Sequence, residues 1–160
     1  MSMKIGIMSD SHDNIPAIAK AVGFFNDVGV SLVIHAGDLI APFVAKPLSE
    51  LDMDLVAVFG NNDGERLGLA QVFEGKIHRA PHALKHAGKD ILILHEPDNL
   101  EALSASGHYD AIVYGHTHDV DIQKGKTLVI NPGECGGWLR GRRTVALWDV
   151  PWGDVEVIPV

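Results

Sequence analysis

Short apolar runs recur along the whole chain, and within most of them the apolar residues are continuous rather than alternating with polar ones. Continuous runs of Val, Ile and Leu are typical of strands that are buried on both faces in a layered sheet. We therefore predict strands at Lys4–Met8, Leu32–His35, Leu55–Phe59, Ile91–Leu94, Ala111–Tyr114, Thr127–Ile130 and Val145–Trp148.

Helical spacing of apolar residues occupies several of the intervals between these runs. One helix is predicted over residues 14–29, because a polar cap at its start and a glycine at its end are typical helix boundaries. A second is predicted over residues 98–107, and a third in residues 41–51, where Pro47 would interrupt it. The last third of the chain shows strands and glycine-containing turns but little helix. Since no repeat or linker is present, we predict one α/β domain over residues 1–160.

Charge and composition narrow the classes of partner. The chain carries 21 acidic and 13 basic residues, for a formal net charge of −8, which argues against binding to duplex nucleic acid or to an anionic membrane. No apolar run approaches the ~20 residues that a membrane span requires. The single cysteine, Cys135, cannot form an internal disulfide, which suits a cytoplasmic location. One compact basic cluster, Arg140, Arg142 and Arg143, is either a solvated loop or a contact to substrate or partner.

Residues with metal-binding side chains follow the predicted strands. In α/β sheets, ligands bind beyond the carboxyl ends of the strands, where successive loops converge. Here these loops supply Asp, Asn or His, often beside a glycine that permits a tight turn. We expect the following residues to face one another across a single site: Asp10, His12, Asp38, Asn61, His95, His116 and His118.

This set of side chains suits two metal ions better than one. Imidazole, carboxylate and amide groups together suit Mn, Fe, Co, Ni or Zn, whereas a structural zinc site would normally use thiolates. One ion cannot use seven protein ligands and still leave room for substrate. Two ions ~3.5–4 Å apart can share a carboxylate, and such a pair lowers the pKa of a water held between them. Asp10 and Asp38 would cancel only half the charge of two divalent ions, which predicts a pocket for an anionic substrate.

The order of the motifs points to a known family. The series Asp-x-His, Gly-Asp, Gly-Asn-x-Asp, His and Gly-His-x-His, which begins at Asp10 and ends at His118, resembles the calcineurin-like metallophosphoesterases. It is most similar to the small single-domain phosphodiesterases of bacteria and archaea, where Gly-Asn-Asn-Asp and Asn-Pro-Gly-Glu also fit. The resemblance covers nearly the whole chain. It implies an α/β (α+β) fold, namely a four-layer αββα sandwich of two mixed β-sheets flanked by helices.

The resemblance also implies a role for each ligand. Asp38 would bridge the two metals, with Asp10, His12 and His118 on the first metal and Asn61, His95 and His116 on the second.

Three departures from the family pattern change the expected chemistry. Many members have a histidine that helps to protonate the leaving group at the position of Asn62, which can donate a hydrogen bond but cannot act as a general acid. The loop after Asp38 lacks the second aspartate of larger relatives. Glu96 replaces a common glycine, which we expect to alter the surroundings of the second metal.

Further site residues are assigned with their alternatives. We assign catalytic roles to His12, Asn62 and Asp63, and substrate-binding roles to Asn62, Arg66 and Glu134. Asp63 is expected to orient Asn61 or a histidine through a hydrogen bond, with a simple Asx turn as the alternative. Arg66 either reaches a phosphate or remains a surface arginine, and Glu134 either faces the site or caps its own turn.

The remaining histidines receive structural interpretations. We predict that His35 is buried and hydrogen-bonded rather than a ligand. His78, His82 and His86 have the spacing of one helix face, but Pro81 lies among them, so we predict a solvated connection there.

Together these observations predict a metal-dependent phosphoesterase, and in the first place a phosphodiesterase that hydrolyses small anionic phosphodiesters through a hydroxide bridging two metals. A phosphomonoesterase with the same site is one alternative. The other is a protein-interaction scaffold of the same fold, such as a retromer scaffold subunit. Such scaffolds tend to have lost catalytic ligands, whereas all seven are present here. The sequence leaves a homo-oligomer open.

Overall fold

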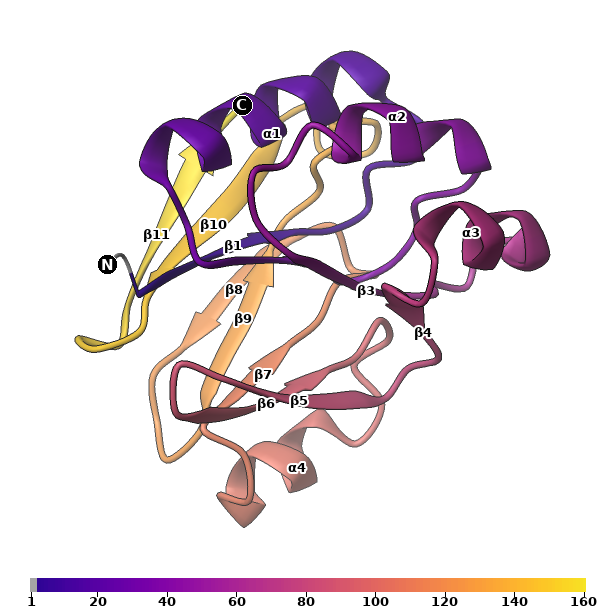
Figure 1. Ribbon diagram of the computed structural model, residues 1–160. Coiled ribbons are helices and arrows are strands. Elements are labelled where there is room, and N and C mark those ends of the chain that lie inside the picture. The colour runs from indigo at the N-terminus through magenta and orange to yellow at the C-terminus, as the bar shows by residue number, and fades with distance from the viewer. Residues whose placement is uncertain (1–2) are drawn as a thin grey trace.

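The computed structural model describes residues 3–160, in which the strands form two sheets packed face to face (Figure 1). The first sheet has six strands, in the order β11 (Asp154–Pro159), β10 (Thr144–Asp149), β1 (Lys4–Met8), β2 (Leu32–His35), β3 (Leu55–Val58) and β4 (Ile77–His78). The second has five, in the order β5 (His82–His86), β6 (Lys89–Ile93), β7 (Ala111–Val113), β9 (Leu128–Pro132) and β8 (Val120–Gln123).

Helices cover the outer face of each sheet. Three α-helices lie over the first sheet, namely α1 (Ile15–Val28), α2 (Ala45–Leu48) and α3 (Arg66–Phe73), and a 3₁₀ turn, Pro42–Val44, precedes α2. Helix α4 (Leu100–Ser106) lies over the second sheet (Figure 1). The arrangement confirms the predicted αββα sandwich of two mixed sheets. No helix within residues 3–160 is long and apolar enough to cross a membrane.

Three apolar layers hold these elements together. Between the two sheets, Ile5, Ile34, Ile93 and Trp148 are almost completely buried, and a second layer fills the space between the first sheet and its helices. A smaller layer lies beneath α4. Burying each large apolar side chain contributes roughly 1.5–3 kcal/mol, so the continuous runs of the sequence hold the sandwich together.

Local signals in the sequence account for α1. The side chain of Asn14 accepts a hydrogen bond from the N–H of Ala17 at its start, and Gly29 ends it in a left-handed conformation with φ 67°. Helix α4 likewise begins after Asn99 and ends at Gly107. Both boundaries confirm the predictions. Pro47 does not interrupt α2, because it lies in the first turn, where the missing N–H has no partner to lose.

Four strands and one helix lie where the apolar pattern predicted none, namely β4, β5, β8, β11 and α3. The solvated connection that we predicted around His78, His82 and His86 was wrong, because these residues lie in β4 and β5. Strand β5 is at the edge of its sheet, and its residues alternate between partly buried and exposed. A strand of this kind lacks a continuous apolar run, which is why the pattern missed it.

The direction of the central strands decides where the site forms. Strands β1, β2 and β3 run parallel in the first sheet, and β6, β7 and β9 run parallel in the second. The carboxyl ends of these strands therefore lie at the same end of each sheet, and these ends of the two sheets lie next to each other. The loops that follow these strands carry the predicted ligands.

Candidate metal centre

The structure brings all seven predicted ligands together where the carboxyl ends of the parallel strands of both sheets meet. Each lies in the loop that follows a parallel strand: Asp10 and His12 after β1, Asp38 after β2, Asn61 after β3, His95 after β6, and His116 and His118 after β7. Hydrogen bonds and close contacts divide them into two groups that meet at Asp38.

The first group consists of Asp10, His12 and His118. The Nε2 atoms of His118 and His12 lie 3.4 Å and 3.9 Å from Oδ1 of Asp10. One ligand atom from each of these residues and from Asp38 lies within 4.8 Å of every other, a spacing at which one metal ion can contact all four. Asp10, Asp38 and His118 are buried and His12 is partly buried.

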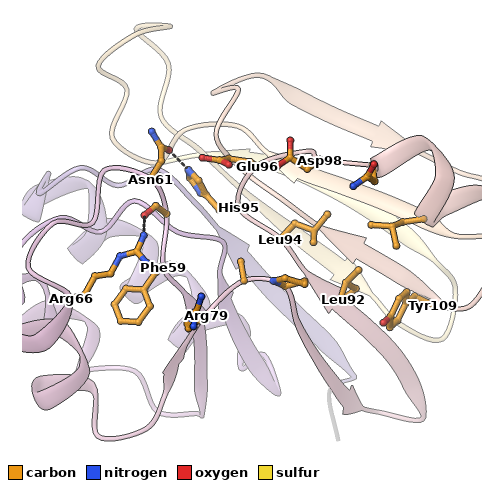
Figure 2. Close-up of a pocket in the computed structure, with 15 residues that line it drawn as sticks. Phe59, Asn61, Arg66, Arg79, Leu92, Leu94, His95, Glu96, Asp98 and Tyr109 are labelled. Atoms are coloured by element: carbon orange, nitrogen blue, oxygen red, sulfur yellow. Dashed lines mark hydrogen bonds between the residues drawn. The ribbon is translucent and has the colours of Figure 1, made fainter.

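The second group consists of Asn61, His95 and His116. Asn61 Oδ1 lies 2.9 Å from Nε2 of His95 and 3.0 Å from Nδ1 of His116 (Figure 2 shows the contact with His95). Oδ2 of Asp38 lies 3.4 Å from His95 Nε2 and 3.3 Å from His12 Nε2. A single carboxylate oxygen therefore faces both groups, as a bridging ligand would.

Two buried polar atoms support a cation in the first group. Asp10 Oδ1 and His12 Nε2 are buried and have no hydrogen-bond partner among residues 3–160. The other carboxylate oxygen of Asp10 is satisfied, because it accepts bonds from Ser9 Oγ at 2.6 Å and from the N–H of His116 at 3.0 Å. Buried polar atoms without a partner are rare in folded proteins, and here both belong to ligand types that bind divalent metals. The residues fit a metal ion.

Backbone strain concentrates at the same residues. Asp10, His12, Asp38, His116 and His118 all have positive φ, between 40° and 68°. This conformation costs non-glycine residues of order 1–3 kcal/mol each and persists where the surrounding structure imposes it, often at functional sites.

Two glycines provide the space that the strained loops need. A Cβ at Gly60 would collide with the carboxylate and backbone of Asp38, and one at Gly115 would collide with Ser9 and Asp10. The glycine in each of the motifs Gly-Asn-Asn-Asp and Gly-His-Thr-His therefore keeps two ligand loops in contact.

Mutual interactions shift the pKa values of the ligands. The neighbouring carboxylates of Asp10 and Asp38 raise the pKa of His12 to about 9. Burial raises the pKa of Asp38, but the neighbouring imidazoles of His12 and His95 outweigh burial and hold it well below its ordinary value. For His95, burial lowers the pKa, but Asp38 outweighs burial and the net pKa is raised. The metal-free site thus keeps Asp38 ionised and retains a proton on His12 that a metal would have to displace.

The relationship to known proteins agrees with this geometry. Residues 3–152 match the model of the calcineurin-like phosphoesterase superfamily domain. The chain belongs to this superfamily. It is 42% identical over 154 residues to phosphodiesterase MJ0936 of Methanocaldococcus jannaschii, an alignment that spans 92% of this chain and 93% of the relative.

Solved structures extend the comparison. The structure of an archaeal phosphodiesterase superposes with a TM-score of 0.92 at 39% identity and covers 99% of this chain and 100% of its own. Vps29 of Chaetomium thermophilum superposes with a TM-score of 0.69 at 19% identity, covering 99% and 94%, which shows a shared fold alone. The protein is therefore a phosphoesterase of this superfamily, with a cluster of Asp and His residues able to bind metal.

Hydrogen bonds fix the orientation of two histidines of the site, His95 and His118. His95 Nδ1 lies 2.7 Å from the carbonyl of Ala36, and His118 Nδ1 lies 2.7 Å from Glu134 Oε2. Each imidazole donates through Nδ1 and thereby turns Nε2 toward the site. Such outer hydrogen bonds fix the tautomer and raise the basicity of a ligand histidine.

Glu134 takes the second of its two expected positions and caps its own turn. Its side chain is only 1% exposed and also accepts hydrogen bonds from the N–H groups of Leu139 and Arg140. Burial raises its pKa, but the bond from His118 and these N–H groups outweigh burial and lower it. Glu134 is therefore an ionised group behind His118, not a side chain that faces substrate as predicted.

Asp63 also differs from its prediction. Its carboxylate accepts hydrogen bonds from the N–H groups of Asp38, Ile40 and Gly60 at 3.0, 2.7 and 2.7 Å, and not from Asn61 or a histidine. It is 2% exposed and burial raises its pKa. Asp63 thus ties the loop after β2 to the loop after β3 and positions Asp38 through the backbone.

Asn62 and Arg66 lie on the open side of the loop after β3. The side chain of Asn62 is exposed, and its Nδ2 donates to Oδ2 of Asp38 at 2.8 Å. Arg66 donates to the carbonyls of Gly60 and Asp63, each at 3.1 Å, and its guanidinium lies 5.2 Å from the centre of the Phe59 ring. Arg66 is therefore held in place beside the second group of ligands.

The inner hydrogen bonds of the site were only partly foreseen. His35 is completely buried and bonded to Ser11 Oγ at 2.9 Å, which confirms the structural role that we predicted, and burial lowers its pKa to about 4. The sequence reasoning missed Ser9, which holds Asp10, and Asn131, which donates to the carbonyl of Gly115 at 3.0 Å. Ser9 follows β1 directly and Asn131 lies near the carboxyl end of β9, and this position at the end of a strand was the available signal.

Two cavities flank the metal centre. One, of about 750 Å³, is lined by Asn61 and His95 of the second group (Figure 2). The other, of about 740 Å³, is lined by His118 and by the cluster Arg140, Arg142 and Arg143. Arg140 forms an ion pair with Asp119 at 2.8 Å. The basic cluster thus lines a cavity that also contacts His118, one of the predicted metal ligands.

Proposed function

We propose that this phosphoesterase is a phosphodiesterase that depends on two divalent metal ions and uses Asp38 as their shared ligand. The observation that carries the proposal is the position of Asp38 Oδ2, 3.3 Å from His12 Nε2 and 3.4 Å from His95 Nε2. The preference for diesters is supported by the name of the relative MJ0936, a phosphodiesterase that is 42% identical over most of both chains. Small phosphodiesters are the proposed substrate class.

The proposed roles follow from the two groups. Asp10, His12 and His118 would hold one ion, and Asn61, His95 and His116 the other. Ions in these positions would lower the pKa of a bound water and would neutralise the negative charge of a phosphate. Manganese, nickel, iron, cobalt and zinc all suit this mixture of imidazole, carboxylate and amide ligands.

The exposed residues of the loop after β3 would bind the phosphate. They would not supply a strong acid to protonate the alcohol that leaves. Asn62 lies on the loop beside Asp38 and can donate its amide hydrogen to a phosphate oxygen, but it has no proton to give to a leaving alkoxide. We propose that the alkoxide takes its proton from water, so that substrates with acidic leaving groups react fastest. Arg66 would contribute positive charge from its fixed position next to Gly60.

The presence of every ligand favours an enzyme over a scaffold. All seven side chains converge, and the buried atoms Asp10 Oδ1 and His12 Nε2 have no other partner among residues 3–160. A cytoplasmic location belongs to the same proposal, supported by the single, buried Cys135, which forms no disulfide.

The test compares two esters that share one leaving group. The metal-stripped protein is supplied in turn with Mn, Ni, Fe, Co or Zn and assayed with bis(4-nitrophenyl) phosphate and with 4-nitrophenyl phosphate. We expect hydrolysis only with metal, and a higher kcat/KM for the diester. A higher kcat/KM for the monoester would make the protein a phosphomonoesterase, and no turnover with any metal despite tight metal binding would favour a scaffold.

A further inference from the structure

The cavity beside the second group of ligands is larger than a phosphate requires. Its walls come from the loop after β3, from Arg79 and Pro81 between β4 and β5, from the end of β6, and from α4 (Figure 2). We call it the Tyr109 cavity, after a residue that lines it opposite Asn61 and His95. Its volume of about 750 Å³ lies within the ~300–1000 Å³ that is typical of ligand pockets. Two proposed metal ligands, Asn61 and His95, line it and connect it to the site of reaction.

One part of this cavity is apolar. Leu92, Leu94, Leu103 and Tyr109 belong to the apolar layer beneath α4 and also line the cavity, and Phe59 contributes a second aromatic ring. Apolar and aromatic walls favour a ring over a second phosphate or another strongly hydrated group.

The charged residues of the cavity balance one another. Arg66 and Arg79 line it together with Glu96 and Asp98, so two positive charges meet two negative ones. Within residues 3–160, no hydrogen bond or ion pair holds the side chains of Arg79, Glu96 or Asp98, which leaves them available to a ligand. Carboxylates accept hydrogen bonds from hydroxyl groups, and a guanidinium donates to carbonyl oxygens. A neutral ligand with hydroxyl and carbonyl groups would satisfy both.

The cavity on the other side of the metal centre has the opposite character. Arg140, Arg142 and Arg143 line it with one acidic residue, Asp119, which leaves an excess of positive charge. Additional phosphates would bind there more favourably than in the Tyr109 cavity. The two ester groups of a diester therefore meet different surroundings.

We propose that the Tyr109 cavity binds the nucleoside of a nucleotide phosphodiester, whose phosphate lies at the metal centre. The base packs on the leucines and Tyr109, its carbonyl groups face Arg79, and the sugar hydroxyls face Glu96 and Asp98. Glu96 is the residue that replaces the glycine common in the family pattern, so this contact would be particular to chains that carry an acid there. The inference rests on the proposed phosphodiesterase function and names its substrate class.

The test uses two diesters with the same leaving group, the 4-nitrophenyl ester of uridine 5′-phosphate and methyl 4-nitrophenyl phosphate. Because the leaving group is identical, the ratio of the two kcat/KM values reports the binding of the nucleoside. We expect a ratio of about ten or more in the parent protein, and a fall of about three- to tenfold in R79Q and in D98N, since each replaces a hydrogen bond to a charged group by a weaker neutral one. Leu103→Trp would fill the cavity and abolish the preference.

Arg142→Gln is the matched control, because it removes the same charge from the second cavity. The proposal requires that it leave the ratio unchanged. It is overturned if the parent hydrolyses both esters with a ratio near one, or if R142Q lowers the ratio while R79Q does not. Arg79 and Asp98 are exposed, so these two variants should fold even if Leu103→Trp does not.

Failure of the proposed function would look different, because neither ester would then be hydrolysed with any metal. In that case calorimetry with the metal-loaded protein decides the matter. Uridine 5′-phosphate must bind about ten times more tightly than methyl phosphate, and R79Q must reduce this difference. Equal affinities would overturn the assignment of the cavity.

Discussion

The two groups of ligands differ in charge and in exposure. The first group contains the carboxylate of Asp10, which is 0% exposed, and His118, which is 8% exposed and bonded to Glu134. The second contains the neutral amide of Asn61, and both Asn61 and His116 are exposed. Because affinity for a divalent ion rises with ligand charge and with burial of a fixed site, we expect the first group to bind its ion tightly and the second weakly.

This difference separates a structural ion from an exchangeable one. The first ion would be retained during purification, and activity would follow occupancy of the second position. Asp38 belongs to both groups and should matter most, so the predictions begin there and continue with residues that touch only one group.

Asp38→Asn should have the largest effect. The amide keeps the shape of the side chain but loses the charge that faces both His12 and His95, so both ions bind more weakly. We expect kcat/KM for an activated diester to fall by about 10³-fold or more. Steady-state kinetics at fixed metal concentration measure the loss, with Asp27→Asn on the exposed surface of α1 as the control. Full activity in D38N would refute the shared ligand.

Substitutions that touch one group should separate the two binding steps. Asp10→Asn removes the buried charge of the first group and should weaken the tight step by about 100-fold. Asn61→Asp adds a charge to the second group and should strengthen the weak step by roughly tenfold. Isothermal titration calorimetry with manganese resolves both steps. The assignment fails if D10N weakens only the second step or if N61D leaves it unchanged.

Glu134→Gln should act on the first group alone, because Glu134 lies behind His118. Loss of its negative charge weakens the hold on the imidazole, and we expect about a tenfold loss in affinity for the first ion. The second step should not change, a selectivity that a general loss of folding would not produce. Equal weakening of both steps would instead indicate a structural role for the loop that Glu134 caps.

The affinity for metal should also depend on pH. Asp10 and Asp38 raise the pKa of His12 to about 9 in the metal-free protein, whereas a metal ligand must be the neutral imidazole. Below pH 9 the metal therefore displaces a proton, and the affinity should rise by about tenfold per pH unit between pH 7 and 9 and then level off. Titrations in buffers of different ionisation enthalpy count the released proton. In H12Q this rise should be smaller, and a flat profile in the parent would contradict the assignment.

The sequence predicted features whose causes are local. Asn14 and Gly29 mark the two ends of helix α1 in the sequence, and continuous apolar runs identify buried strands such as β1. Strand β11 does not, because its residues alternate in burial and it exists only through its pairing with β10. Such pairing depends on residues far apart in the chain, which a pattern of neighbours cannot reveal.

The same distinction holds within the site. The seven ligands were visible because each follows a strand, and the rule that loops gather at carboxyl ends places them together. The role of Glu134 was not visible, since it depends on a contact with His118 across 16 positions of the chain. Asp63 was misjudged for a related reason, because it bonds to backbone N–H groups, and these carry no residue type to recognise.

The most direct test of the two-metal account is a crystal structure of the protein soaked with manganese, with anomalous scattering recorded to locate the ions. The account predicts two anomalous peaks about 3.5–4 Å apart, the stronger beside Asp10 and His118 and the weaker beside Asn61 and His116, with Asp38 in contact with both. One peak at saturating manganese, or two peaks of which only one contacts Asp38, would contradict it.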